Sequence, residues 1–157
     1  MNASPLIDII VTESDRQQVL ELLDQASHAL FKSPDNSIEI ISKNIRFGEA
    51  IFNSLPLEFT NLNARLKNYA LDELSDKLRS ISETKIMVAA LPTPEAQKAL
   101  ADYVTANTSE KNVISFVLDP SILGGAVFMM DGKYIDLSVA RKLSEAFKGE
   151  SLRNLLD

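Results

Sequence analysis

Residues 117–143 are the most distinctive part of this chain and read VLDPSILGGAVFMMDGKYIDLSVARKL. The apolar run at residues 113–118 predicts a strand. Asp119-Pro120 ends it, because proline has a fixed φ and cannot donate a ladder hydrogen bond. Gly124 and Gly125 suit a sharp bend or a close approach to another backbone. We therefore expect a strand that runs into a tight turn.

A hairpin and a final helix are predicted after this turn. Residues 126–130 and 134–135 flank Asp131-Gly132, a dipeptide favoured in tight hairpin turns because both residues tolerate positive φ. Ser138 suits the N-cap of the following helix, and Gly149 suits its end. The apolar positions of this helix fall on one face, at Val139, Leu143 and Phe147.

A strand and a helix are predicted before this stretch. Residues 86–90 read as a strand, and Thr93-Pro94-Glu95 supplies an N-cap, a proline at the first helical position and an acid in the first turn. We expect a helix from Pro94 to about Thr105, which with the strand at 113–118 gives a unit of βαβ length. The predicted apolar stripe of this helix is Ala96, Leu100, Tyr103 and Val104.

The region before residue 84 has helical periodicity. Ser14 and Gln17 have the spacing of a capping box, which predicts a helix start. Its apolar positions recur at steps of three and four, at Val19, Leu22, Leu23, Ala26 and Leu30.

Two further helices are predicted after a turn at residues 33–36. The second has apolar positions at Ile38, Ile41, Ile45 and Phe52, although residues 38–40 read equally well as extended chain. Pro56 breaks this run, and a third helix is expected from Leu57 to about Glu83. Its predicted apolar face is Leu62, Leu66, Tyr69, Leu74, Leu78 and Ile81.

The predicted fold class is therefore α+β, in two domains. Residues 1–83 form a helical domain, either a bundle of amphipathic helices or helices that lie on a partner. Residues 84–157 form a small α/β domain with a β-hairpin and a final helix. A chain of 157 residues with 45% apolar residues is able to bury a core.

Composition argues against several kinds of partner and compartment. With 22 acidic and 16 basic residues the formal net charge is -6, so there is no cationic excess for nucleic acid. The leading residues lack the pattern of a signal or transit peptide. The apolar run at 86–91 is far shorter than the ~20 residues that span a bilayer. We expect a cytoplasmic protein without direct membrane insertion, which reaches a membrane only through a partner.

No residue pattern supports catalysis, a metal site or a cofactor. The chain has no cysteine, and its single histidine, His28, lies beside the stripe of the first predicted helix. Gly124-Gly125 lacks the flanking pattern of a dinucleotide site, and a phosphate-binding loop is absent from the sequence. Acid pairs such as Asp72-Glu73 lie on polar helix faces, where a solvated surface is the expected role. The sequence predicts a non-catalytic protein without cofactor.

The stretch at 117–143 resembles the signature of the delta subunit of rotary F-type ATP synthases, the oligomycin-sensitivity-conferring protein family. In that signature a strand meets an Asp-Pro-Ser-Leu-Ile-Gly-Gly turn, a hairpin turns at Gly-Asp, and Ile-Asp-Gly-Ser-Val starts the final helix. Here the hairpin dipeptide is reversed, Leu137 replaces the usual Gly, and Ala140 stands where a small residue or Arg is common. The resemblance extends back through residues 87–98 and covers roughly half the chain. The matching turn and cap positions are Asp119, Pro120, Gly124, Gly125, Asp131, Gly132, Asp136 and Ser138.

This resemblance implies a non-catalytic stator subunit that links the catalytic head to the peripheral stalk on the cytoplasmic face of the bacterial inner membrane. In the family the C-terminal domain grips the C-terminal helices of the b subunits. The residues expected to contact them here are Met129, Met130, Leu143 and Phe147, because methionine adapts to a partner surface.

The helical domain departs from the family pattern. There, a six-helix bundle of about a hundred residues binds N-terminal segments of the alpha subunits, whereas here three helical stretches precede the C-terminal domain. This half is either a divergent or abbreviated bundle, or it attaches to the head in another way. Its alpha-binding residues are therefore not assigned.

Two other interpretations remain at this point. Each motif residue is also explained by turn chemistry alone, without a partner contact. Separately, the chain can be a non-catalytic binding adaptor of another assembly that shares the C-terminal domain and uses the N-terminal half for its own specificity. A small enzyme is the third interpretation, and the lack of a nucleophile or cofactor loop argues against it.

Overall fold

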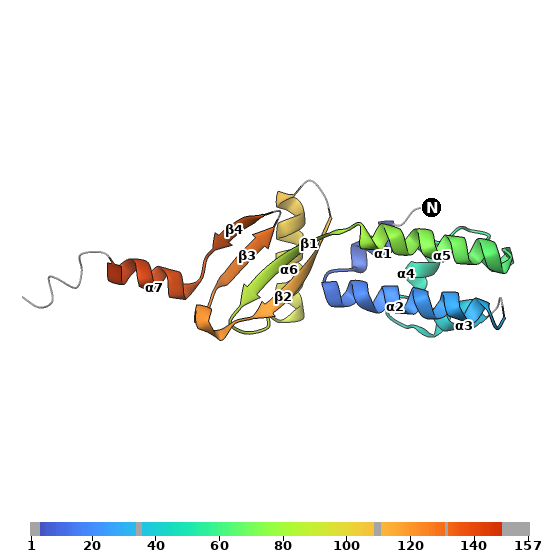
Figure 1. Cartoon of the computed structure of the whole chain (residues 1–157), viewed down its shortest axis with the longest axis horizontal. Coiled ribbons are helices and arrows are strands. Elements are labelled where there is room, and N and C mark those ends of the chain that lie inside the picture. Colours follow the sequence, from blue (N-terminus) through green and yellow to red (C-terminus); the bar gives the residue numbers. More distant parts are fainter. Residues whose placement is uncertain (1–3, 34–35, 109–110, 131, 149–157) are drawn as a thin grey trace, which may run out of the picture. The chain divides into compact units, whose positions relative to one another are not determined.

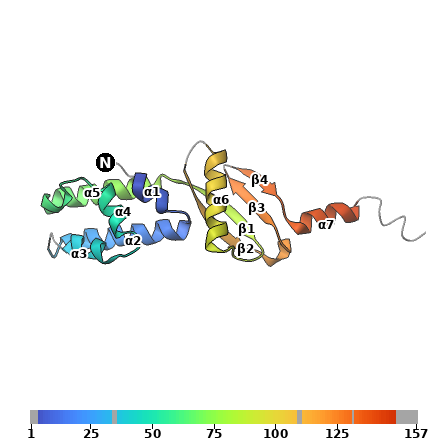
Figure 2. The same ribbon diagram turned by 180° about the vertical axis from the view of Figure 1, so that it is seen from behind.

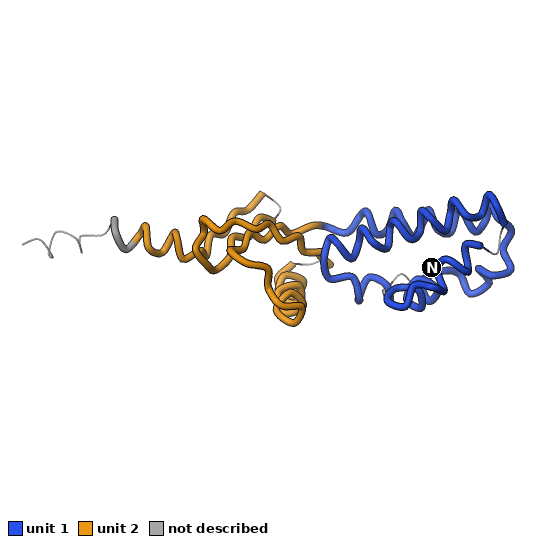
Figure 3. The backbone as a smooth tube through the Cα atoms, turned by 90° about the horizontal axis from the view of Figure 1, so that it is seen from below, with its two compact units in different colours: residues 1–82 blue, residues 83–157 orange. Residues whose placement is uncertain are grey.

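The computed structural model describes residues 4–33, 36–108, 111–130 and 132–148. The chain divides into two compact units, residues 1–82 and 83–157, coloured blue and orange in Figure 3. Unit 1 is helical, and unit 2 combines a sheet with helices. The predicted α+β class, with a helical N-terminal half and a small mixed C-terminal half, is confirmed.

Unit 1 is built around two long helices, α2 (Glu13–Leu30) and α5 (Ala64–Arg79), which lie side by side in Figures 1 and 2. Shorter helices α1 (Ser4–Ile9), α3 (Asn36–Lys43) and α4 (Gly48–Ser54) pack around them, and a 3-10 turn, η1 (Phe59–Asn61), precedes α5. The largest fully buried apolar side chains of this unit are Leu6, Ile10, Leu23, Ile41, Phe47, Ile51, Phe59, Leu71, Leu74 and Leu78.

Helix α2 starts earlier than predicted, and the predicted Ser14–Gln17 capping box was wrong. Thr12 is the N-cap: its Oγ1 accepts from the Asp15 backbone N–H (3.1 Å), and the Asp15 carboxylate accepts from the Thr12 N–H (3.0 Å). The same carboxylate pairs with Arg46 at 2.7 Å. A carboxylate has two acceptor oxygens, so Asp15 holds the Thr12 N–H with Oδ2 while Oδ1 contacts Arg46. The predicted apolar stripe is confirmed, since all five of its side chains are buried.

The prediction of a single second helix was wrong, because the chain forms two shorter helices, α3 and α4, in its place. The Asn44 side chain accepts from the backbone N–H groups of Arg46 (3.1 Å) and Phe47 (2.8 Å), which turns the chain between the two helices. Ile45 is consequently fully exposed, and Phe47 takes the core position. Residues 38–40 are helical, which decides the alternative left open above.

The third predicted helix is shorter than expected and buries a different face. It begins after Asn63, whose side chain accepts from the Leu66 N–H at 3.0 Å. Leu66 and Tyr69, two residues of the predicted apolar face, are exposed and do not pack within the unit. The buried face instead runs at helical spacing through Lys67, Ala70, Leu71, Leu74 and Leu78. The Lys67 ammonium lies 5.9 Å from the centre of the Phe59 ring, a cation–π contact.

Unit 2 is a four-stranded sheet in the order β2-β1-β3-β4. Its strands are β1 (Ser82–Val88), β2 (Asn112–Leu118), β3 (Ala126–Met130) and β4 (Lys133–Asp136). Strand β3 pairs antiparallel with β1, with Ile86 opposite Phe128. It also pairs antiparallel with β4, with Met130 opposite Lys133, so the predicted hairpin is confirmed.

Strands β1 and β2 run in the same direction. At their starts, the Thr84 hydroxyl donates to the Asn112 side chain at 3.2 Å. At their ends, the Asp119 N–H donates to the Val88 carbonyl at 2.9 Å. Helix α6 (Pro94–Asn107) connects them and covers one face of the sheet, as Figures 1 and 2 show from opposite sides. The predicted βαβ unit is therefore present.

Helix α6 has the predicted N-cap, since the Thr93 hydroxyl accepts from the Ala96 N–H. Its predicted stripe was wrong in part, because Ala96 and Tyr103 are exposed while Ala101 and Val104 are buried. Strand β1 also begins before the predicted residue 86. Its polar start is stable in the interior because Thr84 is hydrogen-bonded there.

A 3-10 turn, η2 (Pro120–Ile122), follows β2, and the final helix α7 (Val139–Lys148) follows β4. The predicted helix end at Gly149 lies outside the described residues. The buried apolar side chains of this unit are Ile86, Val88, Ala101, Val104, Val113, Ile114, Ile122 and Val127.

Candidate functional site

The turn after β2 is held by its own backbone and by one carboxylate. Asp119 Oδ1 accepts from the Ser121 N–H at 2.9 Å and caps η2. The hydrogen bonds from Ser121 lower the pKa of Asp119 below its ordinary value of 3.8. Pro120 occupies the first position of η2, where the missing N–H costs nothing.

The double glycine lets this turn lie against the start of α7. The Gly124 carbonyl accepts from the Val139 N–H at 3.0 Å. A Cβ on Gly125 would lie 2.5 Å from the Leu137 carbonyl oxygen, and the φ of this glycine is 74°. A side chain at residue 125 therefore conflicts with both the backbone conformation and the neighbouring chain.

The N-terminus of α7 is fixed by a second set of polar contacts. Ser138 is 2% exposed and its Oγ accepts from the Arg141 N–H at 3.1 Å. Asp136 Oδ1 accepts from the Ser138 N–H at 2.9 Å, and the bonds from Ser138 lower the pKa of Asp136, with a smaller contribution from the Arg141 charge. Arg141 pairs with Glu145 at 2.7 Å, which raises its own pKa.

The motif positions therefore lie in one connected structure of turn, hairpin exit and helix start. Gly132, in the hairpin turn, has φ 74° and no atom within 4 Å of a Cβ built on it. Asp131 lies outside the described residues. The hydrogen bonds described for Asp119, Asp136 and Ser138 are all within the chain, and they fix the turn and the start of α7.

Leu123 is a residue that sequence reasoning missed. It ends η2 in the left-handed conformation, with φ 61°, and its side chain is 64% exposed. For a residue with a Cβ this conformation costs roughly 1–2 kcal/mol relative to the right-handed one. The sequence does not show that this leucine has a positive φ. It shows only that an aliphatic residue directly precedes Gly124-Gly125.

An apolar groove lies between α6 and the hairpin. Its volume is about 440 Å³, and among the residues that the structure describes Lys133 is the only charged one that lines it. Tyr103, Ile135 and Leu137 are exposed at its surface. The lining residues are Thr84, Leu100, Tyr103, Val104, Asn107, Phe128, Met130, Lys133, Ile135 and Leu137.

The four predicted contact residues are not brought together. Met130 lines the α6 groove, whereas Met129, its neighbour on β3, lines a smaller hollow of about 360 Å³ with Lys85 and Tyr134. Met130 borders both hollows. Leu143 is exposed on α7, and the side chain of Phe147 lies outside the described residues.

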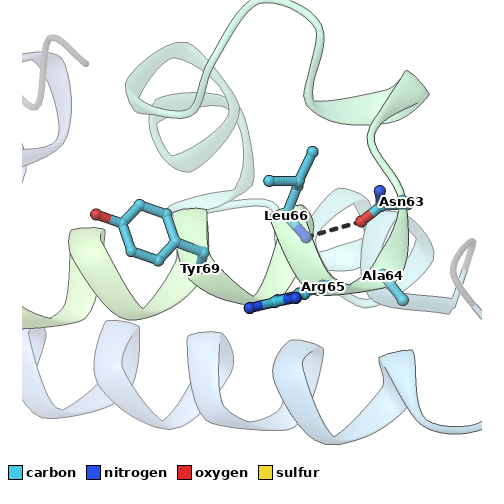
Figure 4. Close-up of a pocket in the computed structure, with 5 residues that line it drawn as sticks. All are labelled: Asn63, Ala64, Arg65, Leu66 and Tyr69. Atoms are coloured by element: carbon cyan, nitrogen blue, oxygen red, sulfur yellow. Dashed lines mark hydrogen bonds between the residues drawn. The ribbon is translucent and has the colours of Figure 1, made fainter.

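Unit 1 has its own exposed apolar surface, on α5. Leu66 and Tyr69 project from the same side of the helix and line a shallow pocket with Asn63, Ala64 and Arg65 (Figure 4). In the described parts of the chain no cluster of three or more metal-ligating side chains is present. Across the same residues, every helix is too short or too polar to cross a bilayer.

Comparisons with known proteins agree on one family. Residues 3–148 match the profile of the family described as ATP synthase delta (OSCP) subunit, so the match includes both units. A protein of Heliobacterium modesticaldum named ATP synthase subunit delta is 32% identical over 72 residues, which is 46% of this chain and 39% of that protein. A protein of the same name from Syntrophomonas wolfei is 28% identical over 71 residues, 45% of this chain and 39% of its own length. The matched segment thus spans about two fifths of these relatives.

Proposed function

Because this chain belongs to the ATP synthase delta (OSCP) subunit family, we propose that it is a non-catalytic peripheral-stalk subunit of an F-type ATP synthase. It links the catalytic head to the b-subunit stalk and so takes part in ATP synthesis coupled to hydrogen ion transport. It is bound peripherally, through the complex, at the cytoplasmic face of the bacterial inner membrane. The family match over residues 3–148 is the observation that carries this proposal.

The proposed role is mechanical. Rotation of the central shaft drags on the head, and a head that turned with the shaft would uncouple proton flow from ATP synthesis. The linker must stay bound through many catalytic cycles, so we expect nanomolar affinity or better, which corresponds to about -12 kcal/mol.

Unit 2 is proposed to bind the C-terminal helices of the b subunits in the α6 groove. An amphipathic helix presents apolar side chains at spacings of three and four residues, which suits a groove lined mostly by apolar side chains. Phe128 and Met130 from β3 and Leu100 and Val104 from α6 form its walls. Lys133 is the one charged residue in the described lining and is exposed to solvent, so a partner helix can bury its apolar face against the other lining residues without burying an unpaired charge.

Unit 1 is proposed to bind N-terminal segments of the alpha subunits. The exposed pair Leu66 and Tyr69 on α5 is the surface that supports this assignment. Aromatic side chains next to aliphatic ones are common in the buried centre of protein interfaces.

The test is an affinity pull-down of the tagged chain from mildly solubilised native membranes, with the bound proteins identified by mass spectrometry. Recovery of alpha, beta and b subunits supports the stator role. Their absence, with the bait soluble and folded, would contradict it and favour an adaptor of another assembly.

Two variants locate the stalk contact. Ile135→Asp places a charge in the α6 groove and is expected to lose the b subunits while keeping alpha. Tyr134→Asp is the matched control, an exposed residue next to it on β4 that lines the other hollow. Loss of b with Tyr134→Asp alone would move the contact to the Met129 side of the hairpin.

A further inference from the structure

We infer that Arg16 anchors the chain at its exit from unit 1 and thereby limits how far unit 2 moves relative to unit 1. This role goes beyond the proposed stalk function and does not depend on it, because it concerns the motion of the chain alone. Arg16 lines neither the α6 groove nor the pocket on α5.

Arg16 joins the first turn of α2 to the chain that follows α5. Its Nη1 donates to the Ile81 carbonyl at 2.6 Å, although 65 positions separate the two residues in the sequence. Its Nη2 is paired with the carboxylate of Glu13, one turn earlier on α2, and only 11% of the Arg16 side chain is exposed. A guanidinium is a planar, rigid group of donors, so the ion pair with Glu13 orients the group that holds Ile81.

The other hydrogen bonds described for the chain just after α5 lead back to the last turn of the same helix. The Ser80 N–H donates to the Asp76 carbonyl at 3.0 Å, and the Ile81 N–H donates to the Leu78 carbonyl at 3.3 Å. Bonds at a helix end open readily, because helix ends fray. The Arg16 contact differs from them because its donor belongs to another helix.

The connection between the two units is short while Ile81 is anchored. On the side of unit 2, the buried Thr84 hydroxyl donates to the Asn112 side chain at 3.2 Å. Residues 82–83 lie between these two anchored positions, and the boundary between the units falls within this pair. Release of Ile81 extends the movable stretch back to Ser80, at the end of α5. A longer connection allows wider motion of the parts that it joins.

The first test measures the anchor itself by residue-resolved hydrogen exchange. Arg16→Met keeps an unbranched side chain at this packed position but has no donor. The Ile81 amide should exchange roughly tenfold or more faster in this variant, the factor expected for loss of a hydrogen bond from a charged donor. Arg79→Met is the matched control, because Arg79 lies at the same end of α5, is 66% exposed and pairs with Asp76. It should leave exchange at Ile81 unchanged.

The second test measures motion between the units by double electron–electron resonance. The chain has no cysteine, so Leu57→Cys in unit 1 and Leu91→Cys in unit 2, both at exposed positions, supply the only labelling sites. The distribution of distances between the two labels should become broader when Arg16→Met is added. Adding Arg79→Met instead should not change it.

Either measurement is able to overturn the anchoring role. Equal distance distributions with and without Arg16→Met, in a folded variant, would do so. In the wild-type chain, an Ile81 amide that exchanges at the rate of an unstructured peptide would do so as well, and this measurement holds even where Arg16→Met fails to fold. Neither result bears on the recovery of alpha and b subunits in the pull-down, so the proposed stalk function stands or falls separately.

Discussion

Gly125 and Gly132 have the same φ of 74° but different surroundings. Alanine at residue 132 meets only the cost of the left-handed conformation, roughly 1–2 kcal/mol, since no atom lies within 4 Å. Alanine at residue 125 adds a 2.5 Å approach to the Leu137 carbonyl, so we expect a larger loss, about 3 kcal/mol or more. Chemical denaturation of both variants measures the difference. Equal losses would mean that the close approach is not a constraint.

Asp136 should make unit 2 sensitive to acid. Its pKa is lowered in the folded chain by the bonds from Ser138, so its stabilisation is present above the ordinary value of 3.8 and is lost as the pH falls through the lower folded value. Asn at this position keeps the acceptor oxygen without titrating. Between pH 7 and pH 2, the unfolding midpoint of Asp136→Asn should fall less steeply than that of wild type, with the difference confined to the range below about pH 4. Parallel curves would show that Asp136 does not contribute.

At the residue scale, the sequence predicted the turns from their glycine and proline residues, but it did not predict the residue with a strained backbone conformation. Gly124-Gly125 predicted a bend or a close backbone approach, and the structure has both. Leu123 was not predicted, because aliphatic residues rarely adopt positive φ and nothing in the sequence shows where one does. The partner roles of Met129, Met130, Leu143 and Phe147 stay predictions.

Among the elements, α2 offers a direct comparison of two candidate caps. Thr12→Ala removes the hydroxyl that accepts from Asp15 and should cost unit 1 about 1 kcal/mol. Ser14→Ala removes a hydroxyl that accepts only from the exposed Gln18 side chain and should change stability by less than about 0.5 kcal/mol. Thermal unfolding of the two variants decides between them. A larger effect at Ser14 would restore the cap that the spacing suggested.

The sequence predicted where the long helices form better than which face of each helix is buried. The stripe of α2 was read correctly because all its apolar residues share one face. In α5, Leu66 and Tyr69 were placed on one apolar face with Leu74 and Leu78, but the helix starts later and buries Lys67 and Ala70 on its packed face. An exposed apolar residue at helical spacing gives the same sequence pattern as a buried one. Hydrophobic periodicity alone therefore does not identify which face of the helix is buried.

For the whole molecule, each unit has its own buried core, which gives a prediction about cooperativity. Ile51→Ala creates a cavity in unit 1 and should cost it about 2–5 kcal/mol. Hydrogen exchange followed by mass spectrometry should then accelerate in residues 4–79 and stay unchanged in β1 to β4. Val113→Ala, in the core of unit 2, is the converse control. Equal acceleration in both units would show that they unfold as one.

The sequence predicted the order of helices and strands in unit 2 better than the number and order of helices in unit 1. Strand, turn and hairpin signals depend on short-range rules at residues such as Asp119, Pro120 and Gly132, so their sequence predicts their order. Helix α1 was not expected, and the break at Asn44 was missed because hydrophobic periodicity does not register the local hydrogen bonds by which this side chain replaces helical ones.

The open space around Gly132 also makes the hairpin tip a place for engineering. A Cβ at Gly132 meets no atom within 4 Å, so residues inserted after Gly132 start from an uncrowded position, whereas the same insertion beside Gly125 would separate chains that lie in close contact. A small fluorescent or epitope label at this tip should therefore leave the fold intact and report on the protein inside a living cell.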